Sequence, residues 1–292
     1  MSSSVSASDD PYYIPEPSPW PIVAMLAIFS LLMGAAFSIN GVGFGSLLIV
    51  VGFVLLGYMF FGWFGDVVEE NMSGKYSGQV DNSFRQGMFW FISSELFFFA
   101  TFFGSLYYIR NISVEWLGGT GYLAATHEFI TSQFVSQWPT AGPLNLGGSF
   151  ALVNTWGVPA INTAILLSSG LTLTWAHWGL KNENRKQLIR GLTMTVVLGV
   201  IFVIMQIQEY AHAYGALNLT LESGVYGSTF YLLTGFHGFH VIVGALMLAA
   251  VLGRSMKGHF TEENHFAFEA AAWYWHFVDV VWLGLFVLVY WM

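Results

Sequence analysis

The chain has 292 residues, of which 55% are hydrophobic and only 9% are charged, whereas ordinary soluble domains carry roughly 25% charged residues. Aromatic residues alone account for 18% of the chain. A soluble fold of this size has too little interior to hide so much apolar surface, so we expect lipid to be the solvent. The lack of cysteine excludes disulfides, iron–sulfur clusters, thiolate zinc sites and cysteine nucleophiles.

The chain begins with a polar, proline-rich segment, residues 1–19, which we interpret as a short disordered tail rather than a cleavable signal peptide. A membrane span needs roughly 20 apolar residues. Seven segments qualify as helices of one all-α membrane domain covering residues 20–292: 20–39, 45–64, 86–109, 159–180, 191–207, 226–252 and 272–291. The long connection at residues 110–158 is rich in Gly, Thr, Trp and Pro, and we expect it to be an ordered outer loop.

The nine basic residues predict how these spans are oriented. All but one lie in the connections between spans two and three, four and five, and six and seven: Lys75, Arg85, Lys181, Arg185, Lys186, Arg190, Arg254 and Lys257. Arg110 alone belongs to an opposite connection. Because inward-facing loops are enriched in Lys and Arg, we expect the N-terminus inside and the C-terminus outside.

One carboxylic acid, Glu95, lies about ten residues from the inner end of the third span, roughly 15 Å deep at 1.5 Å per residue. An ionised acid at that depth is costly, so we expect Glu95 to be protonated, partnered or in contact with water. Two interpretations remain open from the residues alone. Glu95 is either a proton relay or ligand-sensitive switch, or a neutral acid that hydrogen-bonds a neighbouring helix.

The sixth span contains the run Gly-Phe-His-Gly-Phe-His, which places His237 and His240 on one helical face near mid-depth. Histidines in a span suggest a haem or metal site. This spacing supplies at most two ligands, however, and no third lies nearby in the sequence. We therefore favour the alternative that one imidazole is the partner of Glu95, and the depth of His240 matches better.

The seventh span begins with a polar cluster. His276 and Asp279 are three residues apart, so they can face each other or a common partner, and Glu269 precedes them at the inner interface. A catalytic dyad is one interpretation, and polar packing against another subunit is the one we favour. Glu209 and His212, which follow the predicted fifth span, are expected to be outer-surface residues.

The stretch from Trp63 to Asn71 leaves the second span at the inner face, and Arg254 should emerge at the same level. Interfacial Trp with nearby charges is typical of an aromatic belt. A bound lipid headgroup near Glu70 is the more specific hypothesis, but spacing alone favours a solvated interface. The whole sequence contains no phosphate-binding loop, no dinucleotide-binding glycine motif and no basic nucleic-acid patch.

Four segments together resemble subunit III of cytochrome c oxidase, a haem–copper terminal oxidase. The longest is the C-terminal run His-Phe-Thr-Glu-Glu-Asn-His-Phe-Ala-Phe-Glu-Ala-Ala-Ala-Trp-Tyr-Trp-His-Phe-Val-Asp-Val-Val-Trp. The others are Tyr226-Gly-Ser-Thr-Phe with Thr234-Gly-Phe-His-Gly-Phe-His, Ile92-Ser-Ser-Glu-Leu-Phe-Phe-Phe, and Asn162-Thr-Ala-Ile-Leu-Leu-Ser-Ser-Gly with Thr174-Trp-Ala-His. The resemblance runs from about Trp63 to the C-terminus, and the first two spans agree more in position than in sequence.

The resemblance implies two helices and five helices on either side of a V-shaped cleft that binds phospholipids. It implies no catalytic residue, haem, copper or other metal in this chain, because the redox centres belong to subunits I and II. The five-helix part would pack on subunit I. The complex would take electrons from cytochrome c, reduce oxygen to water and pump protons.

The resemblance also implies roles for single residues. Glu95 matches the family's carbodiimide-reactive membrane acid, and Trp63, Glu70 and Arg254 match its lipid-headgroup positions, which revises the solvated-interface interpretation. The resemblance further implies that His237 and His240 bind no metal, and we assign His237, with Glu269, His276 and Asp279, to polar packing or a subunit interface.

The sequence departs from the family pattern at three places. The stretch Trp63-Phe-Gly-Asp replaces the usual Trp-Trp-Arg-Asp, Tyr76 stands where a histidine is frequent, and the loop at residues 112–158 is longer than in compact mitochondrial versions. With the polar tail, the long loop favours a bacterial inner membrane. The first two spans favour cytochrome c as the electron donor, since quinol-oxidising relatives usually have five helices.

Two other hypotheses compete with this one. The chain could be the related accessory subunit of a quinol oxidase or a nitric-oxide reductase. From a different class, it could be a stand-alone proton-coupled transporter that uses Glu95 and His240, although matching broken helices are not evident.

Overall fold

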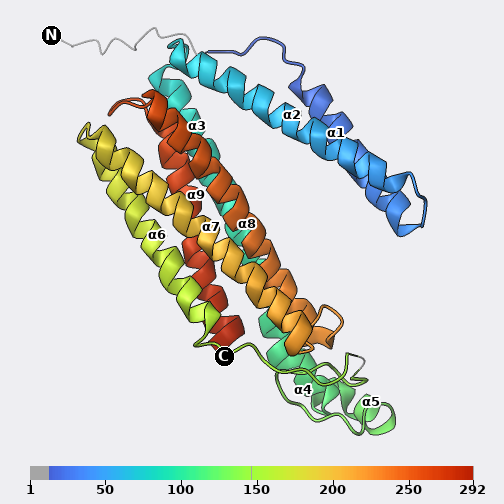
Figure 1. Cartoon of the computed structure of the whole chain (residues 1–292). Helices are drawn as coiled ribbons and strands as arrows, with labels where there is room; N and C mark the ends of the chain where they lie inside the picture. Colours follow the sequence, from blue (N-terminus) through green and yellow to red (C-terminus); the bar gives the residue numbers. More distant parts are fainter. Residues whose placement is uncertain (1–12, 146, 292) are drawn as a thin grey trace, which may run out of the picture. The chain divides into compact units, whose positions relative to one another are not determined.

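The computed structural model describes residues 13–145 and 147–291, so residues 1–12 of the expected polar tail lie outside the described part. Within that part, seven helices are long and apolar enough to cross a membrane, which confirms the predicted all-α membrane fold. Figure 1 labels them. They are α1 (Trp20–Ile39), α2 (Gly45–Met72), α3 (Gly78–Tyr108), α6 (Val158–Lys181), α7 (Arg185–Ala216), α8 (Gly224–Lys257) and α9 (Phe266–Leu285).

Most of these helices run past the predicted spans. The bounds of α1 coincide with the prediction, but α2 continues from Phe64 to Met72, and α7 begins at Arg185 and ends at Ala216. Hydropathy marks only the part of a helix that suits hydrocarbon, whereas backbone hydrogen bonding continues through polar residues beyond it. The sequence therefore located the spans but underestimated the helices.

The outer connection is partly helical. The π-helical turn Ile109–Ser113 and α4 (Val114–Leu117) continue directly from α3, and they are followed by the 3₁₀ turn Gly121–Leu123 and α5 (Ala124–Phe129). Arg110 is thus part of a helix and not of a loop. Past α5 the described residues of the connection are irregular until Val158. The backbone N–H of Ala151 donates to the carbonyl of Leu217, at 2.9 Å, and this holds the connection to the end of α7.

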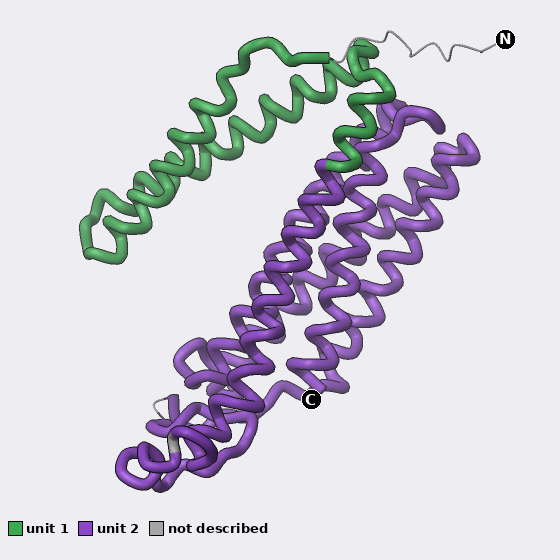
Figure 2. Tube along the Cα trace, turned by 180° about the vertical axis from the view of Figure 1, so that it is seen from behind, with its two compact units in different colours: residues 1–86 green, residues 87–292 purple. Residues whose placement is uncertain are grey.

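The chain divides into two compact units, residues 1–86 and residues 87–292, shown in different colours in Figure 2. Unit 1 contains α1, α2 and the first residues of α3. Unit 2 contains the rest of α3 and the helices α6 to α9, of which α6 packs against α7 and α9, and α8 packs against α7 and α9. The division separates the first two helices from the others, and the V-shaped cleft stays a prediction.

In unit 1, glycines let the backbones of α1 and α2 approach each other. A Cβ atom added at Gly34 would lie 2.7 Å from the backbone nitrogen of Ile49, and one added at Gly45 would lie 2.5 Å from that of Ser38. Lipid tails are as apolar as leucine, so helices in a membrane are held by close packing rather than by a hydrophobic drive. These glycines provide that closeness.

In unit 2, the ring of Trp275 fills the centre of the bundle. Trp275 is fully buried, and Cβ atoms added at Gly199 of α7 or Gly244 of α8 would lie 2.7 and 2.8 Å from its ring. Its indole N–H donates to the hydroxyl of Ser169 on α6, at 2.8 Å. One side chain of α9 therefore contacts three other helices.

Candidate functional site

The structure brings the acid Glu95 on α3 together with His240 on α8. The distance between Glu95 Oε2 and His240 Nε2 is 3.0 Å, and His240 Nδ1 lies 2.6 Å from the carbonyl oxygen of Phe236. A carbonyl can only accept, so Nδ1 carries a proton, and in the neutral ring Nε2 is then an acceptor. The neutral pair therefore requires a protonated Glu95 whose O–H donates to His240.

Aromatic rings surround this pair. The imidazole of His240 lies edge-on to Phe99, with ring centroids 5.0 Å apart, and stacks on Tyr274 at 6.3 Å. The side chain of His240 is only 9% exposed within this chain, whereas that of Glu95 is 21% exposed. The acid is thus open on one side to whatever covers the surface of α3, and its histidine partner is enclosed.

The neighbouring His237 has different partners. Its Nε2 lies 3.2 Å from the carbonyl oxygen of Val278 on α9, so this nitrogen donates to the backbone. The buried ring packs on Trp282, with centroids 5.0 Å apart, and its Nδ1 has no hydrogen-bond partner among the described residues. His237 and His240 therefore share a helix but no common site.

The structure also brings together His276 and Asp279. His276 Nδ1 and Asp279 Oδ2 are 3.5 Å apart, and the side chain of Asp279 is 8% exposed while that of His276 is 45% exposed. A Cβ atom added at Gly170 of α6 would lie 2.5 Å from Asp279 Oδ2. A glycine thus makes room for this carboxyl group at the contact between α6 and α9.

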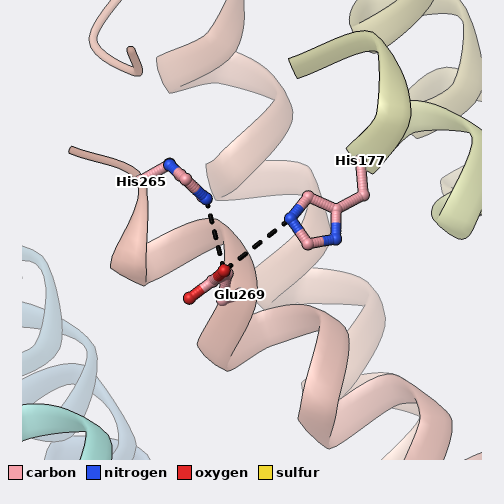
Figure 3. Close-up of side chains that lie close together, drawn as sticks. All are labelled: His177, His265 and Glu269. Carbon is pink, nitrogen blue, oxygen red and sulfur yellow. Dashed lines mark ion pairs between the residues drawn. The ribbon is translucent and has the colours of Figure 1, made fainter. Parts of the chain in front are cut away.

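Glu269, the third polar residue predicted near the start of α9, lies apart from that pair and meets two histidines instead. Glu269 Oε1 is 3.3 Å from Nε2 of His265 and 3.8 Å from Nε2 of His177 (Figure 3). His177 is one turn from the end of α6, and His265 immediately precedes α9. Sequence reasoning missed both as partners, although both lie in the segments that resemble the family.

The prediction that Glu209 lies on the outer surface is wrong. Because α7 continues to Ala216, Glu209 is part of the helix and is 3% exposed. Its Oε1 accepts from the hydroxyl of Tyr290, at 2.6 Å, and from the amide of Gln206, at 3.1 Å. Asn162 of α6 donates to Gln206 in turn, at 3.4 Å. His212, by contrast, is exposed as predicted.

In unit 1, the carboxylate of Glu70 accepts hydrogen bonds from two tyrosines. The hydroxyl of Tyr13 donates to Oε1 at 2.9 Å and that of Tyr76 donates to Oε2 at 2.7 Å. The hydrogen bond to Glu70 raises the pKa of Tyr13, and burial together with the same carboxylate raises the pKa of Tyr76. Both phenols therefore stay protonated donors at neutral pH.

The other two predicted headgroup positions are Trp63 and Arg254. Trp63 in unit 1 is 48% exposed. One turn further along α2 begins a cavity of about 280 Å³, which is lined by Asp66, Glu69, Glu70, Ser73 and Lys75. Arg254 in unit 2 packs its guanidinium over the ring of Phe260, 4.6 Å from the centroid, and its buried Nε has no hydrogen-bond partner among the described residues.

Comparison with known proteins gives one consistent family. A family model described as cytochrome c oxidase subunit III matches residues 10–292. Curated relatives named cytochrome c oxidase subunit 3 include that of Tetraodon nigroviridis, 42% identical over 96% of both chains, and that of Oncorhynchus mykiss, with the same values. The relative from Scyliorhinus canicula is also 42% identical, over 96% of this chain and 97% of its own.

Proposed function

The chain belongs to the cytochrome c oxidase subunit III family, and from that premise we propose that it is the non-redox subunit of a complex that reduces oxygen to water while pumping protons. Haem and copper would be held by subunits I and II, with cytochrome c as the electron donor. The observation that carries this proposal is the match along residues 10–292. The engagement of His237 and His240 with groups of this chain supports it.

Within such a complex, the chain would stabilise subunit I and support proton uptake near the inner surface. The bundle of unit 2 supports this role, because it leaves large apolar side chains such as Phe239, Leu246 and Val280 more than half exposed. Exposed apolar side chains on a membrane helix contact either lipid or another subunit. Direct packing on subunit I would cover part of this surface.

The chain would also bind structural phospholipids through Trp63, Glu70 and Arg254. The cavity beside Glu70 is lined by three acids and one lysine, which suits the ammonium group of a zwitterionic headgroup. Tyr13 and Tyr76 fix the orientation of the Glu70 carboxylate. Arg254, with a buried donor that lacks a hydrogen-bond partner among the described residues, suits a phosphate oxygen.

The chain is an integral membrane protein, and we place it in a bacterial inner membrane with its N-terminus inside. The grouping of the basic residues in three connections supports this orientation. The polar tail and the long outer connection support the bacterial source. Accessibility of single introduced cysteines in right-side-out vesicles tests the orientation without interference, because the chain has no native cysteine.

Co-purification tests the main proposal. We expect the tagged chain, extracted from native membranes in mild detergent, to bring down a membrane partner with the absorption bands of haem, and the complex to oxidise reduced cytochrome c. Oxidation of quinol in place of cytochrome c, or reduction of nitric oxide, would identify one of the related accessory subunits. Isolation without a haem-containing partner, together with proton flux by the reconstituted chain alone, would overturn the proposal in favour of a transporter.

A further inference from the structure

Two histidines and one carboxylate converge at the contact between α6 and α9, in unit 2. The ligand atoms of His177, His265 and Glu269 all lie within 4.8 Å of one another, and Figure 3 shows both rings pointing at one carboxylate oxygen. His265 is 8% exposed. The side chains come from α6, from α9 and from the residue that precedes α9, and none of them takes part in the pairing of Glu95 with His240.

A hydrogen bond fixes the tautomer of His265, and the Nε2 atoms of both imidazoles face the cluster. His265 Nδ1 lies 3.0 Å from the carbonyl of Thr261, so this nitrogen donates to the backbone and Nε2 keeps its lone pair in the neutral ring. The Nε2 atoms of His177 and His265 are both buried and form no hydrogen bond among the described residues. A backbone carbonyl that fixes the tautomer of a ligating histidine is a usual feature of metal sites.

The distances suit a small divalent ion. Zinc binds imidazole nitrogen and carboxylate oxygen at about 2.0–2.2 Å in tetrahedral geometry, which sets ligand atoms roughly 3.3–3.6 Å apart. The observed separations from Glu269 Oε1 are 3.3 Å for His265 and 3.8 Å for His177. The two histidine nitrogens lie within 4.8 Å of each other, so they have to approach each other by at most about 1.5 Å for all three atoms to coordinate one ion.

We propose that His177, His265 and Glu269 bind a divalent transition-metal ion of the zinc class, which joins the end of α6 to the start of α9. Two imidazoles select such ions over Mg²⁺ and Ca²⁺, which prefer oxygen ligands. Three protein ligands leave a fourth position for water. The proposal rests on residues of this chain alone and needs no partner subunit, and it reverses the sequence-based expectation that the chain holds no metal.

A different explanation of the same geometry is an ion pair between Glu269 and a protonated histidine. That arrangement would also hold α6 against α9, but it would need no ion. Only the metal site predicts one bound ion for each chain, with two imidazoles and a carboxylate oxygen among its ligands.

The experiment measures Zn²⁺ binding to the full chain. The chain, purified in detergent and treated with a chelator, is equilibrated with Zn²⁺, and bound zinc is measured after dialysis. We expect one equivalent, and the zinc K-edge spectrum should show two imidazoles and oxygen. His177→Ala and His265→Ala should each weaken binding at least about tenfold, the size seen even for loss of an outer-shell partner.

Two further variants distinguish coordination from general damage. Glu269→Gln keeps the volume of the side chain and removes its charge, so we expect it to retain the helical circular dichroism of the wild type and lose zinc affinity. His212→Ala removes an exposed histidine of α7 outside the cluster and should bind zinc as the wild type does. Zinc should raise the melting temperature of the wild type and of His212→Ala, but not that of Glu269→Gln.

Two results would overturn the proposal. One is the absence of stoichiometric zinc binding by the folded wild-type chain. The other is zinc binding that His177→Ala, His265→Ala and Glu269→Gln leave unchanged, which would show adventitious binding elsewhere.

Discussion

In unit 1 the helices α1 and α2 meet through glycines, whereas in unit 2 a large ring and buried polar side chains are added to glycine contacts such as those of Gly179 and Gly191 between α6 and α7. Of the most apolar stretch of α1 or of α2, only 11% is buried within the chain, against 56% for the span that begins with α9. Gly34 and Gly45 bring two backbones together, while Trp275 contacts three other helices and Glu209 of α7 accepts a hydrogen bond from the distant Tyr290. A pair of helices needs only close approach, and a bundle needs side chains that fill and connect its centre.

The largest effect should follow from emptying the centre of unit 2. We expect Trp275→Ala to lower the free energy of unfolding by about 3 kcal/mol, near the low end for aromatic truncation, because lipid also solvates the ring in the unfolded state. Titration of the purified chain with dodecyl sulfate, followed by circular dichroism, measures it. Trp273→Ala, at a ring 38% exposed on the same helix, is the control. An equal loss in both variants would remove the special role of Trp275.

In unit 1 the contact depends on having no side chain at one position. We expect Gly34→Leu to destabilise the chain by about 1–3 kcal/mol, because its Cβ would lie 2.7 Å from the backbone of Ile49 and push α1 away from α2. Gly57→Leu on α2 is the matched control, since nothing lies within 4 Å of its added Cβ. The same titration should leave Gly57→Leu near the wild type, and a comparable loss there would contradict the packing argument.

A smaller effect should follow from removing one hydrogen bond of the polar network that Glu209 forms with Tyr290 and Gln206. We expect Tyr290→Phe to cost about 1 kcal/mol, because Glu209 keeps the amide of Gln206 but loses its shorter hydrogen bond, at 2.6 Å. Tyr107→Phe, at a phenol 65% exposed, should change stability by only a few tenths of a kcal/mol. If the two variants are equal in dodecyl sulfate titration, the network does not stabilise unit 2.

The smallest effect is expected at Glu95. In the neutral pair the acid donates to Nε2 of His240, and the amide of Glu95→Gln can donate to the same atom. We therefore expect the assembled oxidase to change its turnover rate by less than about threefold, or roughly 0.7 kcal/mol in barrier height. Oxygen consumption with reduced cytochrome c measures this, and complete loss in a correctly assembled variant would make Glu95 an obligatory proton carrier.

The features that sequence reasoning found depend on local composition and depth. The apolar runs located seven spans, and counting depth from the flanking basic residues paired Glu95 with His240 across 145 positions of the chain. This is possible because every span crosses the same hydrocarbon thickness, so residue counts from the membrane surface give comparable depths. A soluble protein offers no such measure between distant segments.

The features that sequence reasoning missed depend on polar residues near the helix ends. Glu209 follows the apolar run of α7, so hydropathy predicts a position outside the membrane, and no neighbouring residue indicates its partner Tyr290, 81 positions away. Closeness in sequence groups Glu269 with His276, whereas its partner His177 is on another helix. Hydropathy describes contact with solvent and does not describe which polar groups meet.

The length of α7 gives Glu209 a particular environment. From Arg185 to Glu209 the helix rises roughly 36 Å at 1.5 Å per residue, which exceeds the hydrocarbon core of about 30 Å. With Arg185 among the headgroups of one leaflet, and a typical tilt of about 20°, Glu209 reaches the headgroups of the other. Tyr290, Gln206 and Glu209 would then form a buried polar layer at the depth of that leaflet's headgroups.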